Sequence, residues 1–79
     1  MDIKIYTKNT CNFCFAAKHI LAKCGLSYEE IPVIDQATVS EMQKLSGAST
    51  VPQIFIDGVS IGGYQELAGM VSSGRLNAA

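Results

Sequence analysis

Hydrophobic and polar positions alternate near the N-terminus and then change to a helical spacing. Residues 3–6 alternate two isoleucines with a lysine and a tyrosine, which predicts a first strand. The polar segment 7–10 follows as a loop. From Phe13 onward, one helical face is traced by apolar residues at positions 13, 17, 20, 21 and 24. Another face, expected to point toward water, carries Lys18, His19 and Lys23. Gly25 stands where a left-handed residue ends such a helix.

The middle of the chain predicts a second strand and a second helix. Residues 28–34 form the strand, and Pro32 within it cannot donate a ladder hydrogen bond, so this strand should lie at a sheet edge or carry a bulge. Val39, Met42 and Leu45 have helical spacing, and Gly47 ends that helix.

A hairpin and a third helix complete the pattern. Residues 53–56 and 59–61 are two strands joined by Asp57-Gly58, a dipeptide that favours a type I′ turn. After Gly62-Gly63, a third helix is indicated by Leu67, Met70 and Val71, with Gly74 as its end.

The predicted order is therefore βαβαββα, an α/β fold in a single domain over residues 1–79. The first two strands should be parallel, because a helix joins them, and the hairpin adds two antiparallel strands. Helices must cover both faces of so small a sheet.

Composition excludes several classes of protein. With 79 residues, 48% of them hydrophobic and 16% charged, the chain is one globular domain and not a disordered tail. A net charge of −1 without a basic cluster argues against nucleic-acid and membrane partners. The longest strictly apolar run, Phe13–Ala17, is too short for a transmembrane helix or a signal peptide. We therefore expect a soluble, cytoplasmic protein.

Three cysteines are too few for a disulfide scaffold, but two of them form a Cys-x-x-Cys pair between the first strand and the first helix. Cys11 falls at the start of the helix, where unpaired backbone N–H groups and the helix dipole stabilise an anionic sulfur. Lys8 adds positive charge nearby. Cys14 lies one turn inside the helix, within reach of a disulfide, and should be more buried, with a higher pKa. This arrangement suits disulfide exchange, which needs a stable leaving thiolate as well as a nucleophile.

A zinc-knuckle spacing overlaps the pair: Cys11-x2-Cys14-x4-His19-x4-Cys24. On a helix these side chains spread around the axis and cannot converge on one ion. Cys24 is then expected to be a small core residue and His19 a solvated one. Phe13 should be a half-exposed ring at the rim of the site, and no metal is expected.

Two later segments are candidates for the other half of the site. Pro52, after Ser49-Thr50-Val51, either simply begins the third strand or follows a cis bond that turns the Val51 backbone toward a ligand. A ligand in extended conformation would then pair with Val51 as a short added strand. Gly62-Gly63 is either a flexible turn or a place where a ligand carboxylate approaches the start of the third helix.

Four segments occur in a fixed order: Ile5-Tyr6-Thr7-Lys8, Cys11-Asn12-Phe13-Cys14, Thr50-Val51-Pro52-Gln53-Ile54-Phe55-Ile56 and Ile61-Gly62-Gly63. Together they resemble the glutaredoxin family over nearly the whole chain, and the length is similar to that of small bacterial dithiol members. The resemblance implies a thioredoxin-like fold, a four-stranded mixed sheet flanked by three helices, with glutathione as cosubstrate.

The resemblance also implies a role for each site residue. Cys11 is the nucleophile and Cys14 the resolving thiol. The glutathione contacts would be Lys8 and Phe13 at its glycine end, Thr50, Val51 and Pro52 along its cysteine, and Gly63, Tyr64 and Gln65 at its γ-glutamyl end. Two features depart from the family pattern. Asn12-Phe13 replaces the usual Pro-Tyr, and of the two usual acidic positions after the glycine pair, Gln65 takes the first and Glu66 the second. The missing charge at Gln65 would weaken binding of the glutathione ammonium.

The expected activity is glutathione-dependent reduction of glutathionyl mixed disulfides and protein disulfides, by a monomer. Two alternatives stay open. Some relatives with Cys-Gly-Phe-Ser bridge a [2Fe–2S] cluster, and this chain shares the phenylalanine, although Cys14 offers a competing disulfide. Other glutaredoxin-like proteins serve ribonucleotide reductase with electrons from thioredoxin reductase, and the loss of charge at Gln65 keeps this alternative open.

Overall fold

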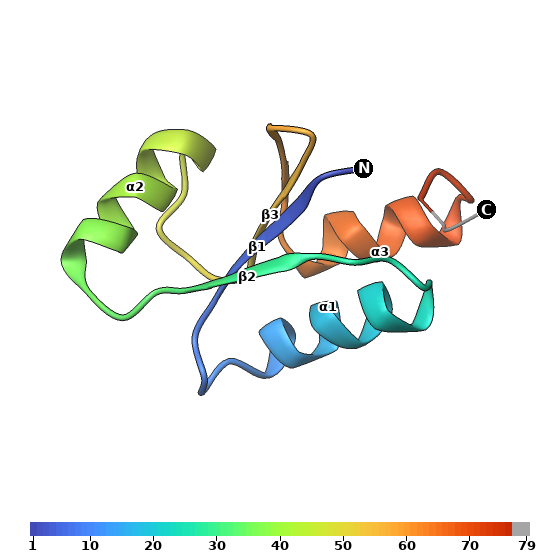
Figure 1. The fold of residues 1–79 in the computed structure, drawn as a ribbon, viewed down its shortest axis with the longest axis horizontal. Helices are drawn as coiled ribbons and strands as arrows, with labels where there is room; N and C mark the ends of the chain where they lie inside the picture. Colours follow the sequence, from blue (N-terminus) through green and yellow to red (C-terminus); the bar gives the residue numbers. More distant parts are fainter. Residues whose placement is uncertain (77–79) are drawn as a thin grey trace.

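Four strands and three helices alternate along the chain in the computed structural model, which describes residues 1–76 (Figure 1). The strands are β1 (Ile3–Thr7), β2 (Glu29–Pro32), β3 (Gln53–Ile56) and β4 (Val59–Gly62). The helices are α1 (Asn12–Lys23), α2 (Gln36–Ser46) and α3 (Tyr64–Ser72). The predicted order βαβαββα is confirmed.

The strands form one mixed sheet in the order β2-β1-β3-β4. β1 and β2 are parallel, whereas β3 is antiparallel to both β1 and β4. β2 lies at an edge of the sheet, as Pro32 predicted, because proline has no N–H to donate and an edge strand has one side that needs no partner strand. The strand is shorter than the predicted 28–34, since its pairing with β1 ends where Thr7 meets Pro32.

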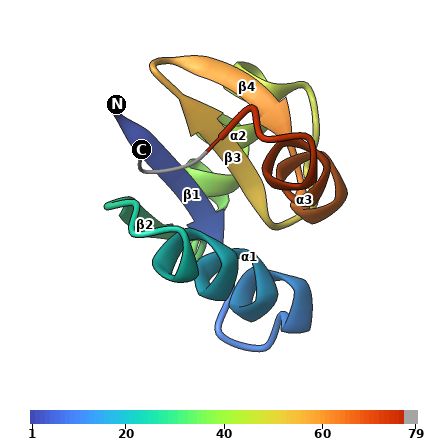
Figure 2. The same ribbon diagram turned by 90° about the vertical axis from the view of Figure 1, so that its right-hand side faces the viewer.

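Helices cover both faces of the sheet, and each face has its own core. On one face, α1 and α3 lie side by side and bury Ile5, Leu21, Ile54 and Leu67 completely (Figure 2). On the other face, Met42 of α2 packs with side chains that point away from the first core: Tyr6, Val33 and Phe55. Alternation along β1 and β3 therefore sends neighbouring residues into different cores.

The chain reverses between β3 and β4 at Asp57 and Gly58, whose φ angles are +52° and +82°. Positive φ at both residues is the backbone of a type I′ turn, as the dipeptide predicted. Gly25, Gly47 and Gly74 also have positive φ, each just beyond a helix. Each helix therefore ends at its predicted glycine.

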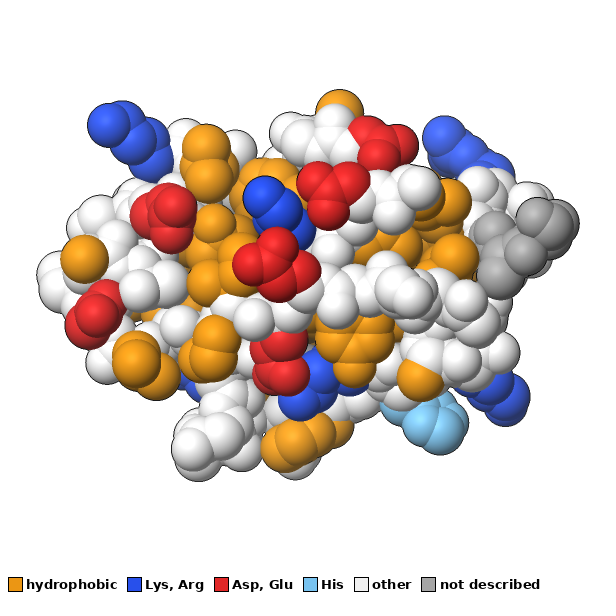
Figure 3. Space-filling model, in the orientation of Figure 1, with side chains coloured by type: hydrophobic (Ala, Val, Ile, Leu, Met, Phe, Trp, Pro, Cys, Tyr) orange, Lys and Arg blue, Asp and Glu red, His pale blue; other side chains and the backbone are white. Residues whose placement is uncertain are grey.

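The surface mixes both signs of charge. Figure 3 shows acidic and basic side chains scattered over one face, with hydrophobic side chains between them. Within residues 1–76, no helix has the length and apolar character needed to cross a membrane.

Candidate active site

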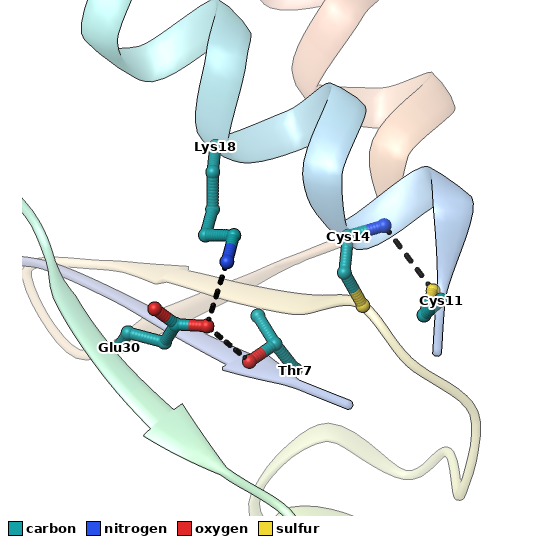
Figure 4. Close-up of polar contacts among 5 residues, drawn as sticks. All are labelled: Thr7, Cys11, Cys14, Lys18 and Glu30. Carbon is teal, nitrogen blue, oxygen red and sulfur yellow. Dashed lines mark hydrogen bonds and ion pairs between the residues drawn. The ribbon is translucent and has the colours of Figure 1, made fainter. Parts of the chain in front are cut away.

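Cys11 is the N-cap residue of α1, with extended backbone angles of φ −98° and ψ 113°. Its Sγ accepts a hydrogen bond from the backbone N–H of Cys14 at 3.2 Å (Figure 4). The first N–H groups of a helix have no partner within it, so one of them is available to a negatively charged sulfur. The predicted position of Cys11 at the start of the helix is confirmed.

The Cys11 sulfur has a second polar neighbour. As a thiol, it donates to the backbone carbonyl of Val51 at 3.7 Å. A thiolate has no proton to donate, and it keeps only the N–H of Cys14 as a partner. Val51 precedes β3, so this contact joins the start of α1 to the opposite side of the site.

Cys14 is completely buried and points from α1 toward the sheet (Figure 4). Burial, followed by the hydrogen bond with Cys11, raises the pKa of Cys14 to about 11. Removing the thiolate from water is the larger cause, because a buried anion loses its hydration. The predicted greater burial and higher pKa of Cys14 are confirmed.

A groove of about 230 Å³ runs beside the cysteines, between the start of α1 and the start of α3. Its lining residues are Phe13, Val51, Pro52, Tyr64, Gln65 and Glu66. Phe13 is 59% exposed, and its ring centroid lies 5.5 Å from that of Tyr64. Phe13 therefore stands at the rim of the site, as predicted, and the two rings face each other from different helices.

The backbone around the groove is closely packed. The Val51–Pro52 peptide bond is cis, the second of the two alternatives for this proline. A Cβ on Gly63 would lie 3.2 Å from the Pro52 carbonyl oxygen. Gly62 has φ +106°, and a Cβ there would lie 2.8 Å from Cγ of Glu66. The glycine pair thus permits a close approach of β4 and α3 to the groove.

Glu66, at the second acidic position of the family pattern, also lines the groove, although it was not among the predicted contact residues. Its Oε1 accepts the backbone N–H of Gly63, the N-cap of α3, at 2.7 Å. This is one half of a capping box, and a glutamate three residues after the N-cap is its sequence signal. A carboxylate therefore lies in the groove beside the uncharged Gln65.

Three predicted contact residues are not among those that line this groove: Lys8, Thr50 and Gly63, the N-cap residue just before Tyr64. Lys8 is exposed and lines a second hollow, of about 300 Å³, together with Pro32 and Val33. Thr50 is exposed, and its hydroxyl accepts a hydrogen bond from Gln53 at 3.4 Å.

Two expectations for α1 need correction. Cys24 is only half-buried, because the helix ends before it and Cys24 becomes the C-cap residue. Lys18, assigned to the water-facing side, instead forms an ion pair with Glu30 of β2 at 2.9 Å. His19 is exposed as predicted, on the one continuous helix that carries the zinc-knuckle spacing. Among the described residues, no three His, Cys, Asp or Glu side chains gather in a way that could hold a metal ion.

Comparison with known proteins places this geometry in context. The family model described as Glutaredoxin matches residues 3–61. Glutaredoxin 3 of Escherichia coli (strain K12) is 44% identical over 77 residues, covering 96% of this chain and 93% of the relative.

Solved structures agree with the sequence match. The solution structure of a glutaredoxin from Brucella melitensis has a TM-score of 0.83 at 38% identity, covering 95% of this chain and 83% of the other. A buckwheat glutaredoxin–glutathione complex has a TM-score of 0.85 at 26% identity, covering 94% and 71%.

Proposed function

Because this chain belongs to the glutaredoxin family of thiol-disulfide oxidoreductases, we propose that it uses glutathione to reduce glutathionyl mixed disulfides and protein disulfides. The observation that carries the proposal is the contact of Cys11 Sγ with the Cys14 N–H at the start of α1. A sulfur held there is stabilised as an anion, which makes it both a nucleophile and a leaving group.

The first step is attack of the Cys11 thiolate on the glutathionyl sulfur of a mixed disulfide. The product thiolate leaves and takes up a proton, and Cys11 now carries glutathione in a disulfide. A second glutathione, as its thiolate, attacks the glutathionyl sulfur. Oxidised glutathione forms, and the Cys11 thiolate returns to its place as N-cap. This cycle does not require Cys14.

Protein disulfides follow a second route that does require Cys14. Cys11 attacks the protein disulfide and forms a mixed disulfide, and Cys14 then attacks Cys11 and releases the reduced protein. Cys11 in a disulfide has neither a charge nor a thiol proton, so both of its contributions that raise the pKa of Cys14 are removed. Formation of the mixed disulfide therefore makes the resolving thiol more acidic when it is needed.

The groove offers a complementary surface for glutathione. Val51 presents backbone groups for pairing with its cysteine, and the first N–H groups of α3, at Tyr64 and Gln65, suit the γ-glutamyl carboxylate. The Glu66 carboxylate suits the ammonium, and so provides a charge that Gln65 lacks. The buckwheat glutaredoxin–glutathione complex supports this choice of ligand.

A coupled assay tests the proposal. NADPH consumption is followed with glutathione, glutathione reductase and a small glutathionyl disulfide. We expect turnover by the wild type, none by Cys11→Ser, and retained turnover by Cys14→Ser. Cys24→Ser is the matched control, because Cys24 lies at the other end of α1. Turnover by Cys11→Ser, or its absence in the wild type, would overturn the proposal.

A further inference from the structure

Three side chains from three elements meet on the sheet side of α1, outside the groove. Glu30 of β2 accepts two hydrogen bonds on one carboxylate oxygen, from Lys18 Nζ at 2.9 Å and from Thr7 Oγ1 at 2.6 Å (Figure 4). Thr7 is buried, and the side chain of Lys18 is only 22% exposed. The network therefore fixes a normally mobile lysine against the sheet.

Lys18 lies one helical turn after Cys14 on the same face of α1. Figure 4 shows both side chains leaving the helix toward the sheet, with the Lys18 ammonium directed at Glu30. Glu30 thus holds an ammonium group on the same side of α1 as the buried thiol of Cys14, the resolving cysteine of the proposed dithiol route.

We propose that Lys18 is a positioning residue for the resolving step: Glu30 and Thr7 hold its ammonium where it favours the anionic form of Cys14. The inference rests on the proposed dithiol route. In that step the Cys14 thiol loses its proton to solvent, and the thiolate attacks Cys11 Sγ. The Cys11–Cys14 disulfide forms, and the bond from Cys11 to the substrate sulfur breaks. The substrate thiolate leaves with the electron pair and is protonated.

The groups that face Cys14 shift its pKa in opposite directions. Burial raises its pKa, as does Cys11 at the N-cap, whereas the backbone N–H of Lys8, after β1, and the charge of Lys18 lower it. Glu30, on β2, places a negative charge behind Lys18 and partly cancels its field. Loss of the lysine charge and loss of the glutamate charge should therefore have opposite effects on Cys14, whereas loosening of a structural contact would act in one direction.

An aromatic disulfide, dithiobis-nitrobenzoate, reports both thiols in one experiment. With less than one equivalent of reagent, attack by Cys11 releases a first coloured thiolate, and attack by Cys14 on the resulting mixed disulfide releases a second. All proteins carry Cys24→Ser, so that only the two site cysteines react. The variants Lys18→Met, Lys18→Arg and Glu30→Gln are compared by stopped flow over a range of pH, with thermal unfolding as a check that each is folded.

In Lys18→Met we expect the pH profile of the second phase to move up by about one pH unit, so that less Cys14 is present as thiolate at a given pH. The remaining Cys14 thiolate is a stronger nucleophile, so the second phase should slow only roughly threefold. Lys18→Arg should restore the rate, and Glu30→Gln should move the pH profile downward. The first phase should stay within about twofold, since it belongs to Cys11.

Two results would overturn the inference: a second phase that does not change in Lys18→Met, or a Glu30→Gln profile that moves upward as the Lys18→Met profile does. Failure of the proposed function is distinguishable from either. In that case the wild-type site would itself show no second phase, or Cys14→Ser would retain one.

Discussion

The raised pKa of Cys14 makes the stability of the reduced protein depend on alkaline pH. In the unfolded chain this thiol ionises near its ordinary pKa of 9.0, whereas in the folded protein burial keeps it protonated to about pH 11. The unfolded state therefore loses the proton first as the pH rises. The protonated Cys14 thiol therefore contributes in full to the free energy of unfolding below pH 9, and this contribution is lost between pH 9 and about pH 11.

The expected loss is substantial for so short a chain. One proton contributes about 1.4 kcal/mol per pH unit, so the two-unit window corresponds to about 3 kcal/mol. A chain of 79 residues has a total stability of roughly 4–12 kcal/mol. Ionisation of this one thiol therefore weakens the reduced fold by a large fraction of its stability.

Urea unfolding of the reduced protein at several alkaline pH values measures this loss, and Cys14→Ala isolates it. The variant lacks the titrating thiol, so its free energy of unfolding should fall less steeply than that of the wild type between pH 9 and 11. Cys24→Ala is the matched control, since Cys24 is only half-buried, and it should keep the wild-type slope. If Cys14→Ala and the wild type lose stability in parallel, buried Cys14 is not the cause and the reasoning fails.

Three further substitutions test the groove. Phe13→Ala removes the ring that faces Tyr64 and should raise KM for a glutathionyl disulfide roughly two- to tenfold. Phe15→Ala, an exposed aromatic on the same helix outside the groove, should leave KM unchanged, and equal effects would refute the assignment. Gly62→Ala places a Cβ against Glu66 at φ +106° and should cost about 1–3 kcal/mol in urea unfolding. Gly69→Ala, in open space on α3, should instead stabilise the fold, so a harmless Gly62→Ala would contradict the geometry. Glu66→Ala breaks the bond to the Gly63 N–H and should lower stability and raise KM, both measured as above. Glu66→Gln keeps the acceptor without the charge, so it should recover stability but not KM, and recovery of both would exclude a role for the charge.

The fold was predictable because its elements are marked locally. Periodicity identifies strands and helices, and residues such as Gly47 and Gly58 stand where only positive φ continues the chain. The length of β2 was not predictable in this way. Its pairing runs from Lys4↔Glu29 to Thr7↔Pro32, so the strand stops where its partner stops, whatever its own residues favour.

The site was predictable where one local feature sets a residue's role. Cys11 and Cys14 follow from the start of one helix, and Phe13 from its position between them. Lys18 and Glu30 were not paired in advance, because they are 12 residues apart and meet only when α1 packs over the register of β2. Lys18 has a polar side chain on an amphipathic helix, and its spacing alone does not distinguish a solvated lysine from one held by a neighbouring strand.

The two cysteines share one helix start and yet have opposite environments. The N-cap residue lies outside the helical hydrogen-bond ladder, so Cys11 receives a free N–H and stays in contact with the groove. Three residues later the helix has turned Cys14 toward the sheet, where burial holds it as a neutral thiol. A spacing of two residues between the cysteines therefore places one sulfur at a free backbone N–H and the other in a buried, protonated state, within reach of each other. What the helix start does not provide is a way to ionise the second thiol. That requirement falls on the groups around Cys14: the loss of the Cys11 charge in the mixed disulfide, and the ammonium that Glu30 holds one turn away.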